Sequence, residues 1–411
     1  MAAAGPTAAL RLIGARNFGP YFVGNAASAS GTWFQNLAAA LLVYRLTHHS
    51  AFWLGVLNFG NFVPVLLLAP WAGSAADRFD RRRLLLATQL VSVALSGSLA
   101  ALAWAGLAHV WVVIVFALGL GTMSAFSAPA SMALIGNLVP RRQLASAVAL
   151  NSMTFNLARA IGPVLATVSV RALGIPASFA INSASYLLLV LGVLVVRSNG
   201  RIHASRAETR LRESLRLVRR QPELLAFLLI VTAVGFASDP VNTEAPAFAR
   251  AFGRADSAAG FVIGAFGAGA VLAAFMLAGR VAGSRRRMVF TLLLLGGGMI
   301  AFSLSRWLPL GFVLLAIAGF GYLASNTSAT SRLQLAVEEQ QRGRIMALWS
   351  VAFLGFRPAA SLLDGAVAGA FGVRAAGVVL AVPALGCAAA ILAVPRLARY
   401  RPAPASESRN G

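Results

Sequence analysis

Residues 73–83 hold a short, densely charged segment between two long apolar runs, at 51–75 and 84–106. Four arginines stand within six residues there, at positions 78, 81, 82 and 83, and such a cluster crosses a lipid bilayer only at a high cost in free energy. Each flanking run is long enough to cross the hydrocarbon once, because about 20 apolar residues of helix span it. The segment therefore predicts two membrane-spanning helices joined by a connection in water.

The same alternation of apolar runs and charged connections continues along the whole chain. Of its 411 residues, 58% are hydrophobic and only 11% are charged, whereas a soluble domain carries about 25% charged residues. Continuous apolar runs of about 20 residues indicate helices, while the strands of a membrane barrel would alternate apolar and polar residues. We therefore expect an all-α integral membrane protein.

All 35 basic residues are arginine, and the formal net charge is +23. Such a charge would suit a nucleic-acid-binding protein, but the arginines gather in alternate connections between the apolar runs. This positive-inside pattern places those connections and both termini in the cytoplasm, so no nucleic-acid partner is expected. The lack of lysine also excludes a G-x-x-x-x-G-K phosphate loop, and with it an ATP-driven pump on this chain.

Twelve apolar runs are long enough to span a bilayer, and an arginine-rich stretch with apolar residues at helical spacing divides them. We expect an N-terminal six-helix bundle at 1–197, a cytoplasmic amphipathic linker at 198–221, a C-terminal six-helix bundle at 222–395 and a disordered cytoplasmic tail at 396–411. The expected spans are 17–46, 51–75, 84–106, 110–137, 145–172, 177–197, 222–250 with a break, 258–281, 287–305, 308–336, 344–371 and 374–394.

The two halves of the chain resemble each other at a spacing of about two hundred residues. Arg159 in the fifth span corresponds to Arg357 in the eleventh, and the arginines at 81–83 correspond to those at 285–287. Two bundles related by an axis along the membrane normal, with a binding site between them, are typical of transporters built from parallel repeats. The repeat therefore favours a pseudo-symmetric pair of six-helix bundles.

The charged segment resembles the loop between the second and third helices of the major facilitator superfamily, whose pattern is G-x-x-x-D-R-x-G-R-[KR]. The residues that match this pattern are Gly73, Asp77, Arg78, Arg81 and Arg82. Asp80 replaces the second glycine, and a D-R-x-D-R-R form is common in the enterobactin-exporter and macrolide-efflux branch, the transmembrane secretion effectors. Further likenesses to that branch lie at 31–36, 156–163 and 342–347.

This resemblance implies a carrier, not an enzyme, in which two bundles alternate in opening a central cavity to either side. The matching residues would form a gating motif, in which Asp77 docks near the N-terminus of the eleventh helix, around Arg344, and keeps the cytoplasmic side closed. A carboxylate at the positive end of a helix is stabilised by about 0.3–1 kcal/mol, which makes such a gate physically reasonable. The alternative is that Asp77 only pairs with a loop arginine.

Ionisable side chains at membrane depth cost at least about 2.5–3.5 kcal/mol each, so they face a cavity or a partner and mark a pathway. Counted along their helices, Arg159, Asp239 and Arg357 fall at a similar depth and are expected in one layer. Asp364 lies on nearly the same helix face as Arg357, and Glu244 lies near the outer mouth. Asp239 is the expected proton-coupling carboxylate, with Arg159, Arg357 and Asp364 as further candidates. A static ion pair that fixes the packing of the bundles is the alternative.

Polar side chains on the first, fourth, seventh and tenth spans line the transport path in this superfamily. Each could instead make a hydrogen bond between packed helices. In the fifth span, Gly162 and Pro163 are expected either to bend the helix or to let another helix pack closely. The candidates for the cavity wall are Asn25, Gln35, Asn36, Ser124, Ser127, Asn326 and Thr327.

Together these features predict a secondary active transporter that uses a proton gradient, with no cofactor or metal, to export an amphipathic small molecule such as a drug or a siderophore. A lipid or lysolipid carrier or a nutrient importer of the same fold is the alternative. An intramembrane enzyme is disfavoured because the four histidines lie in or beside connections, where they cannot build a buried catalytic or metal site. The expected partners are the substrate and the lipid bilayer, with a monomeric chain in a bacterial inner membrane.

Overall fold

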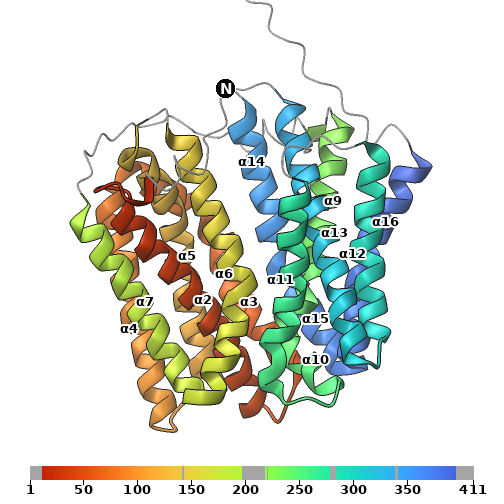
Figure 1. Cartoon of the computed structure of the whole chain (residues 1–411), viewed down its shortest axis with the longest axis horizontal. Helices are drawn as coiled ribbons and strands as arrows, with labels where there is room; N and C mark the ends of the chain where they lie inside the picture. Colours follow the sequence, from red (N-terminus) through yellow and green to blue (C-terminus); the bar gives the residue numbers. More distant parts are fainter. Residues whose placement is uncertain are drawn as a thin grey trace, which may run out of the picture.

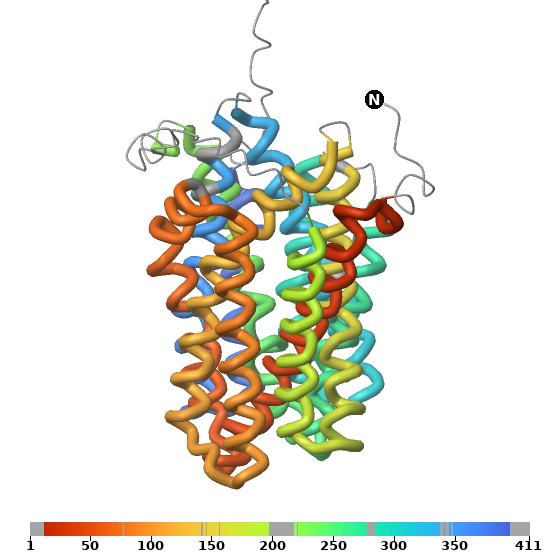
Figure 2. Tube along the Cα trace, turned by 90° about the vertical axis from the view of Figure 1, so that its left-hand side faces the viewer, coloured from red at the N-terminus to blue at the C-terminus, as the bar shows by residue number. Residues whose placement is uncertain are grey.

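The computed structural model describes residues 12–140, 143–196, 218–219, 221–277, 284–337 and 341–394, without the side chains at 77, 145, 156, 342–344 and 347. The described part of the chain contains helices and no strands. Figure 1 shows the helices standing side by side in two groups, with the first half of the chain (red to yellow-green) beside the second (green to blue). Most of them run the full length of the molecule, as Figure 2 shows from the side.

The first group is a bundle of six helices that follow one another up and down. They are α2 (Gly19–Leu46), α3 (Ala51–Arg78), α4 (Arg81–Trp104), α5 (Val110–Leu138), α6 (Leu144–Leu173) and α7 (Ile175–Val195). The second bundle repeats this order, with two of its spans broken into pieces. Its elements are α9 (Pro222–Thr243), α10 (Ala245–Ala251), η2 (Asp256–Ala258), α11 (Ala259–Met276), α12 (Arg285–Leu304), α13 (Leu308–Leu335), α14 (Arg342–Ser350), η4 (Val351–Gly355), α15 (Arg357–Phe371) and α16 (Val373–Ala393).

Eleven segments of the described chain are long and apolar enough to cross a membrane, and each coincides with an expected span. The remaining expected span, 17–46, coincides with α2, which has 28 residues and is therefore about 42 Å long. Its polar side chains lower its mean hydropathy. The fold class is thus confirmed as an all-α membrane protein with two six-helix bundles. The expected bounds of the linker and the tail stay predictions, because nearly all of 198–221 and all of 396–411 lie outside the described residues.

Two spans differ from expectation in a way that matters for function. The charged segment was expected to be a turn from residue 73 to 83, but α3 continues to Arg78 and only Phe79 and Asp80 connect it to α4. The side chain of Asp80 accepts a hydrogen bond from the Arg83 amide at 2.8 Å, which caps α4 and allows so short a connection. The eleventh span is interrupted by η4, a turn of π-helix, before Pro358, whose missing amide cannot continue an α-helix.

The repeat is visible in how the helices pack. In the first bundle α2 packs on α7, α3 on α5, and α4 on α7; in the second, α9 packs on α16, α11 on α13, and α12 on α16. The last connection of each bundle is a single glycine in the left-handed region, Gly174 (φ 84°) and Gly372 (φ 86°), a conformation that other residues rarely adopt. The same one-residue turn in both halves supports a duplication of the six-helix unit.

One arginine in each bundle ties the beginning of one helix to the end of another. Arg82, at the start of α4, donates to the carbonyls of Val193 (2.9 Å) and Leu194 (2.7 Å) at the end of α7. Arg285, at the start of α12, donates to the carbonyls of Ile391 (2.6 Å and 3.0 Å) and Leu392 (2.8 Å) at the end of α16. The last carbonyls of a helix have no partner within the helix, so these arginines satisfy groups that would otherwise face lipid headgroups or water.

The two bundles meet along two seams, α3 against α15 and α6 against α11. We call the end of the molecule where α2, α4 and α6 finish the Arg45 end, and the opposite end the Arg81 end. Glycines bring the backbones together near the Arg45 end of both seams. A Cβ atom on Gly55 would overlap the Ser361 carbonyl oxygen, and one on Gly260 would overlap the Pro163 carbonyl oxygen.

We expect Gly55→Ala to destabilise the protein, because its methyl group meets the backbone of α15, which cannot move away as a side chain could. Overpacking of this kind costs about 1–3 kcal/mol. Thermal unfolding of the purified protein in detergent, followed by tryptophan fluorescence, should show a lower midpoint. Gly297→Ala is the matched control, since no atom lies within 4 Å of that Cβ position and alanine is the better helix former. An equal loss in both variants would contradict the close seam.

Arg285→Ala should loosen the end of α16, because it removes three hydrogen bonds to the last carbonyls of the helix, which have no partner within the helix. Hydrogen bonds from a charged donor are worth about 1.5–3 kcal/mol each. Hydrogen–deuterium exchange should therefore become faster in the last turns of α16 and stay unchanged in α13. Arg286→Ala, the exposed neighbour, serves as the control and should leave the exchange of α16 unchanged. Slow exchange in both variants would show that Arg285 does not hold the helix end.

Candidate functional site

Asp239 lies in α9 and is fully buried. Thr243, one turn further along the helix, donates a hydrogen bond to its Oδ2 at 2.9 Å. The other oxygen, Oδ1, accepts no hydrogen bond, and the Nε of Arg357 lies 3.9 Å away from it. This distance is too long for a hydrogen bond but still within the limit of about 4 Å for an ion pair. The pair is therefore electrostatic and loosely held, which leaves the arginine free to change partner.

Arg357 occupies a special position because it is the first residue of α15, directly after the π-helical turn. Its side chain is 15% exposed. The guanidinium lies 4.3 Å from the ring centroid of Phe62, which belongs to α3 in the other bundle. A cation above an aromatic face is attracted to it, more strongly where water is excluded. Arg357 therefore contacts Asp239 in its own bundle and Phe62 across the seam.

Arg159, on α6, makes the corresponding contact from the first bundle to the second. Its Nη1 donates a hydrogen bond to the hydroxyl of Tyr322 on α13 at 2.6 Å, and its guanidinium lies 4.7 Å from the ring centroid. Arg159 and Arg357 are close enough for their charges to repel. The structure thus brings the expected layer together, but Asp239 pairs with Arg357 while Arg159 is held by Tyr322, a residue that no sequence pattern singled out.

Two further carboxyl groups, Glu244 and Asp364, are fully buried close to this layer. Glu244 stands at the junction of α9 and α10, and Asp364 lies two turns after Arg357 on α15. None of their four carboxyl oxygens has a hydrogen-bond partner. Asp364 is close enough for the charges of Glu244 and Asp239 to act on it. The site therefore contains three buried acids and one arginine that directly faces one of them.

Two of the candidates for the cavity wall make packing contacts inside the first bundle. Gln35 is buried, and its Oε1 accepts hydrogen bonds from Ser96 (2.5 Å) and Asn182 (2.6 Å) on α4 and α7. Asn25 donates to Asn151 on α6 at 2.7 Å. For Gln35 the structure shows the alternative of a hydrogen bond between packed helices, which sequence spacing could not choose because it does not tell which face of α2 meets α4 and α7. Interhelical hydrogen bonds of this kind are worth about 0.6 kcal/mol.

The other candidates remain open to a ligand. Asn36, Ser124 and Thr327 have exposed side chains, and the Oδ1 of Asn326 has no hydrogen-bond partner. Ser127 is half-buried and donates to the carbonyl of its neighbour Ser124 at 3.3 Å. An exposed polar group is costly against lipid tails but not against a water-filled path between the bundles. These residues stay predictions for the substrate path.

The gating motif is only partly described. The side chain of Asp77 and those of residues 342–344 lie outside the described part, so the expected gate stays a prediction. Gly73 lies within α3 with no atom within 4 Å of its Cβ position, and Arg78 is exposed. Arg81 contacts Asn137 at 3.3 Å on α5, and Arg82 caps the end of α7. Two of the motif's arginines thus hold helices of their own bundle together.

Gly162 and Pro163 serve close packing, and α6 continues as a helix through both. A Cβ atom on Gly162 would lie 2.7 Å from the Cβ of Trp33 on α2, so the glycine lets these helices touch. Pro163 presents its carbonyl to Gly260 of α11 across the seam. The pair therefore supports packing within the first bundle and between the bundles.

Polar contacts join the bundles at the Arg45 end, and sequence analysis did not pair these residues. Arg45 donates to Asp256 with two hydrogen bonds, of 2.7 Å and 2.9 Å. Arg171 donates to the Ser257 hydroxyl at 3.2 Å, and the amide of Gly260 donates to the Thr167 hydroxyl at 3.1 Å. One sequence feature could have indicated these contacts: Arg45 and Arg171 stand at connections that are otherwise poor in charge. Together they close this end of the molecule.

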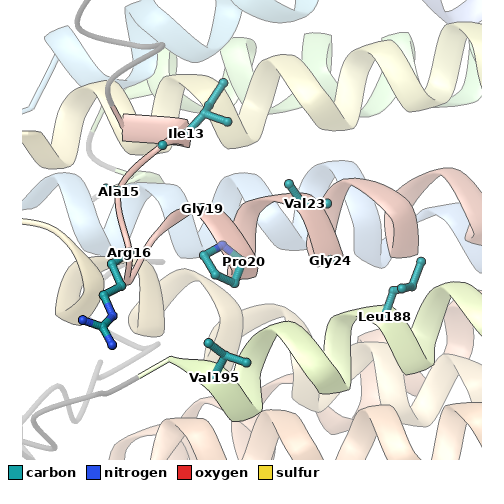
Figure 3. A pocket seen from close by; sticks show the side chains of 10 residues that line it. Ile13, Ala15, Arg16, Gly19, Pro20, Val23, Gly24, Leu188 and Val195 are labelled. Carbon is teal, nitrogen blue, oxygen red and sulfur yellow. The ribbon is translucent and has the colours of Figure 1, made fainter.

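A pocket with a volume of about 510 Å³ lies at the start of α2 beside the end of α7, away from the layer of Arg159, Asp239 and Arg357. Figure 3 shows its lining, which includes Ile13, Val23 and Leu188 and is apolar apart from Arg16. Such a surface suits contact with lipid tails. It contributes none of the ionisable residues of the buried layer.

Comparison with solved structures shows the same fold in known transporters. A bacterial homologue of the human lysosomal transporter Spinster, in an inward-facing and unoccupied conformation, matches with a TM-score of 0.74 and 16% sequence identity, over 94% of this chain and 99% of that one. The nucleoside transporter NupG matches with a TM-score of 0.70 and 13% identity, over 93% of this chain and 99% of that one. At this identity the likeness concerns the fold alone.

Sequence relatives with assigned roles are transporters. The staphyloferrin A transporter of Staphylococcus aureus is 33% identical over 162 residues, which are 39% of this chain and 41% of that protein. The multidrug efflux pump Tap of Mycolicibacterium fortuitum is 26% identical over 82% of this chain and 85% of the pump, and the macrolide efflux protein A of Enterococcus faecalis is 25% identical over 45% and 59%. The match thus spans less than two thirds of the length of the first and third of these relatives.

The family model for transmembrane secretion effectors matches residues 7–410, almost the whole chain. This agrees with the twelve-span pattern, the paired bundles and the transporter relatives. The chain belongs to the transmembrane secretion effector family of major facilitator superfamily transporters, and is a multi-pass membrane transporter rather than an enzyme.

Proposed function

We propose that this transporter exports an amphipathic small molecule and is driven by a proton gradient, with Asp239 and Arg357 as the coupling pair. The observation that carries the proposal is the fully buried Asp239 carboxyl, whose Oδ1 has no hydrogen bond and faces Arg357 at 3.9 Å. Ionisable groups in a membrane protein mark pathways for ions and substrates. Export is favoured because relatives are named as efflux proteins for macrolides and for several drugs.

Movement of one bundle against the other changes which residues Arg357 contacts. Asp239 and Arg357 belong to the second bundle, whereas Phe62 and Arg159 belong to the first. Rocking one bundle against the other changes the distance of Arg357 from Phe62 and Arg159 but not the fold that holds Asp239. When Arg357 turns toward Asp239, the carboxylate form is favoured; when it turns away, a buried carboxyl with no cation takes up a proton. Proton uptake and release thus follow the position of Arg357.

Export also requires an orientation, which we assign from the arginine-rich connections. The positive-inside rule places the Arg81 end in the cytoplasm and the Arg45 end outside the bacterial inner membrane. The contacts of Arg45, Arg171 and Gly260 then close the outer side. The polar groups of Asn36, Ser124 and Thr327 and the ring of Phe62, which we assign to the path between the bundles, suit a molecule with both polar and apolar parts.

Asp239→Asn should abolish the coupling while keeping substrate binding, because the amide has the shape of the carboxyl but cannot exchange a proton. In proteoliposomes with an imposed pH gradient, we expect substrate accumulation to fall by about tenfold or more, the size of a typical coupling free energy. Binding of the same compound to detergent-purified protein should change little. Glu223→Gln, in the first turn of the same helix, is the matched control. Accumulation by Asp239→Asn at the level of that control would refute the role of Asp239.

The substrate class is tested with inside-out vesicles that contain the purified wild-type protein and a pH-sensitive dye. A soluble amphipathic drug or a siderophore that is exported should cause proton movement when it is added, and should accumulate in the vesicles. A lysolipid that binds while no soluble compound moves protons would instead favour a lipid carrier of the same fold. Vesicles with Asp239→Asn protein give the background in both cases.

A further inference from the structure

Glu244 and Asp364 have no assigned role in the coupling pair, yet both are fully buried at membrane depth. Their four carboxyl oxygens have no hydrogen-bond partner. Ser361, one turn before Asp364, lies beside Asp239 and is also fully buried. A set of buried polar groups with unused hydrogen-bonding capacity is rare in a folded protein and needs an explanation.

Four arginines near this end have partners other than these two carboxyls. Arg357 faces Asp239, and Arg45 donates to Asp256 from its Nε and Nη2 atoms. Arg250 contacts His49 at 3.4 Å, and Arg374 donates to the backbone carbonyls of Ser303 and Ser305. Taking a carboxylate out of water without a cation or hydrogen-bond donors costs several kcal/mol, whereas the neutral acid avoids most of this cost.

Both carboxyls lie close to the first bundle. Tyr44, near the end of α2, lies within reach of the charge of Glu244. Gly365, next to Asp364, packs against α3, where its Cβ position lies 2.9 Å from the Cα of Gly55. Opening of the Arg45 end separates α2 and α3 from the second bundle and admits water to both acids. Exposed to water, the two carboxyls ionise; enclosed again, they must be neutral.

We propose that Glu244 and Asp364 form a second proton-binding site next to Asp239, and that the Arg45 end closes only when these two acids are protonated. Closure then traps two protons beyond the one that Asp239 exchanges. The number of protons carried in each cycle rests on the proposed function, whereas the dependence of closure on protonation does not.

The direction of the pH effect separates these acids from the other titratable groups at the same end. Protonation of Asp256 would break its pair with Arg45 and would therefore open this end at low pH. Tyr44 stays neutral between about pH 5 and about pH 9, because a phenol ionises only near pH 10 or above. Titration of the buried acids has the opposite effect: the Arg45 end is closed at low pH and opens as the pH rises.

The test measures closure directly, without a substrate. Spin labels are placed at Leu107→Cys and Trp307→Cys, exposed positions at the Arg45 end of the two bundles, in a Cys387→Ala background that removes the one native cysteine. Double electron–electron resonance spectroscopy in nanodiscs then gives the distance between the two labels. The measurement runs from about pH 5 to about pH 9, the range in which buried carboxyls titrate. We expect the open population to grow with pH in the labelled parent.

Glu244→Gln with Asp364→Asn should keep the Arg45 end closed at every pH, because the amides stay neutral without a proton. Asp256→Asn should raise the open population but retain its increase with pH, and Glu223→Gln should match the parent. A parent distance that does not depend on pH would overturn the proposal, as would a double variant with the parent's profile. The amides preserve the shape of the acids, and a single sharp elution peak would show that the variant is folded.

The same proteins distinguish a failure of this inference from a failure of the proposed function. If closure follows the protonation of Glu244 and Asp364 while transport needs no proton gradient, the second site stands and the coupling mechanism falls. If transport needs the gradient and Asp239 but closure is independent of pH, the coupling pair stands and the second site is refuted.

Discussion

The loosely held pair of Asp239 and Arg357 is the interaction on which the rest of the site depends. It exists because the π-helical turn and Pro358 place the arginine at the start of α15, opposite a carboxyl that α9 buries completely. A tighter, fully hydrogen-bonded pair would be harder to break inside a membrane, because the separated charges would not be hydrated there. Arg357 thus has two partners, the Oδ1 of Asp239 at 3.9 Å and the ring of Phe62 at 4.3 Å from its centroid.

The contacts that close the Arg45 end are suited to repeated opening. Arg45 is 46% exposed and Asp256 10% exposed, so water screens their attraction, and exposed ion pairs contribute about 0–1 kcal/mol. The glycines of the seams allow close approach without interlocking side chains, so the surfaces can separate without first unpacking. The buried acids act differently, since their neutral form allows closure and their charged form opposes it. Weak contacts at the Arg45 end fit a protein whose halves move as units.

Sequence analysis predicted the helices and the depth of the charged residues, because a run of about 20 apolar residues and a rise of 1.5 Å per residue determine both. It also predicted that the buried arginines and Asp239 would meet. It could not predict that Tyr322 would hold Arg159, or that Gln35 would bond to Ser96 and Asn182, because the rotation of each helix about its axis depends on its neighbours. The contact between Arg45 and Asp256 joins residues 211 positions apart and leaves no local pattern. The π-helical turn depends on how α3 and α9 pack on η4.

The one-residue turns at Gly174 and Gly372 have a mechanical consequence. A connection with no spare length passes any tilt of one helix directly to the next, so α6 with α7, and α15 with α16, each behave as a single rigid lever. α6 and α15 carry Arg159 and Arg357 and also form the two seams. A force that separates α6 from α15 therefore also moves α7 and α16. The ends of these two helices, to which Arg82 and Arg285 donate hydrogen bonds, move with them. A ligand that reaches only the two central arginines would thus act on helices at the periphery of both bundles.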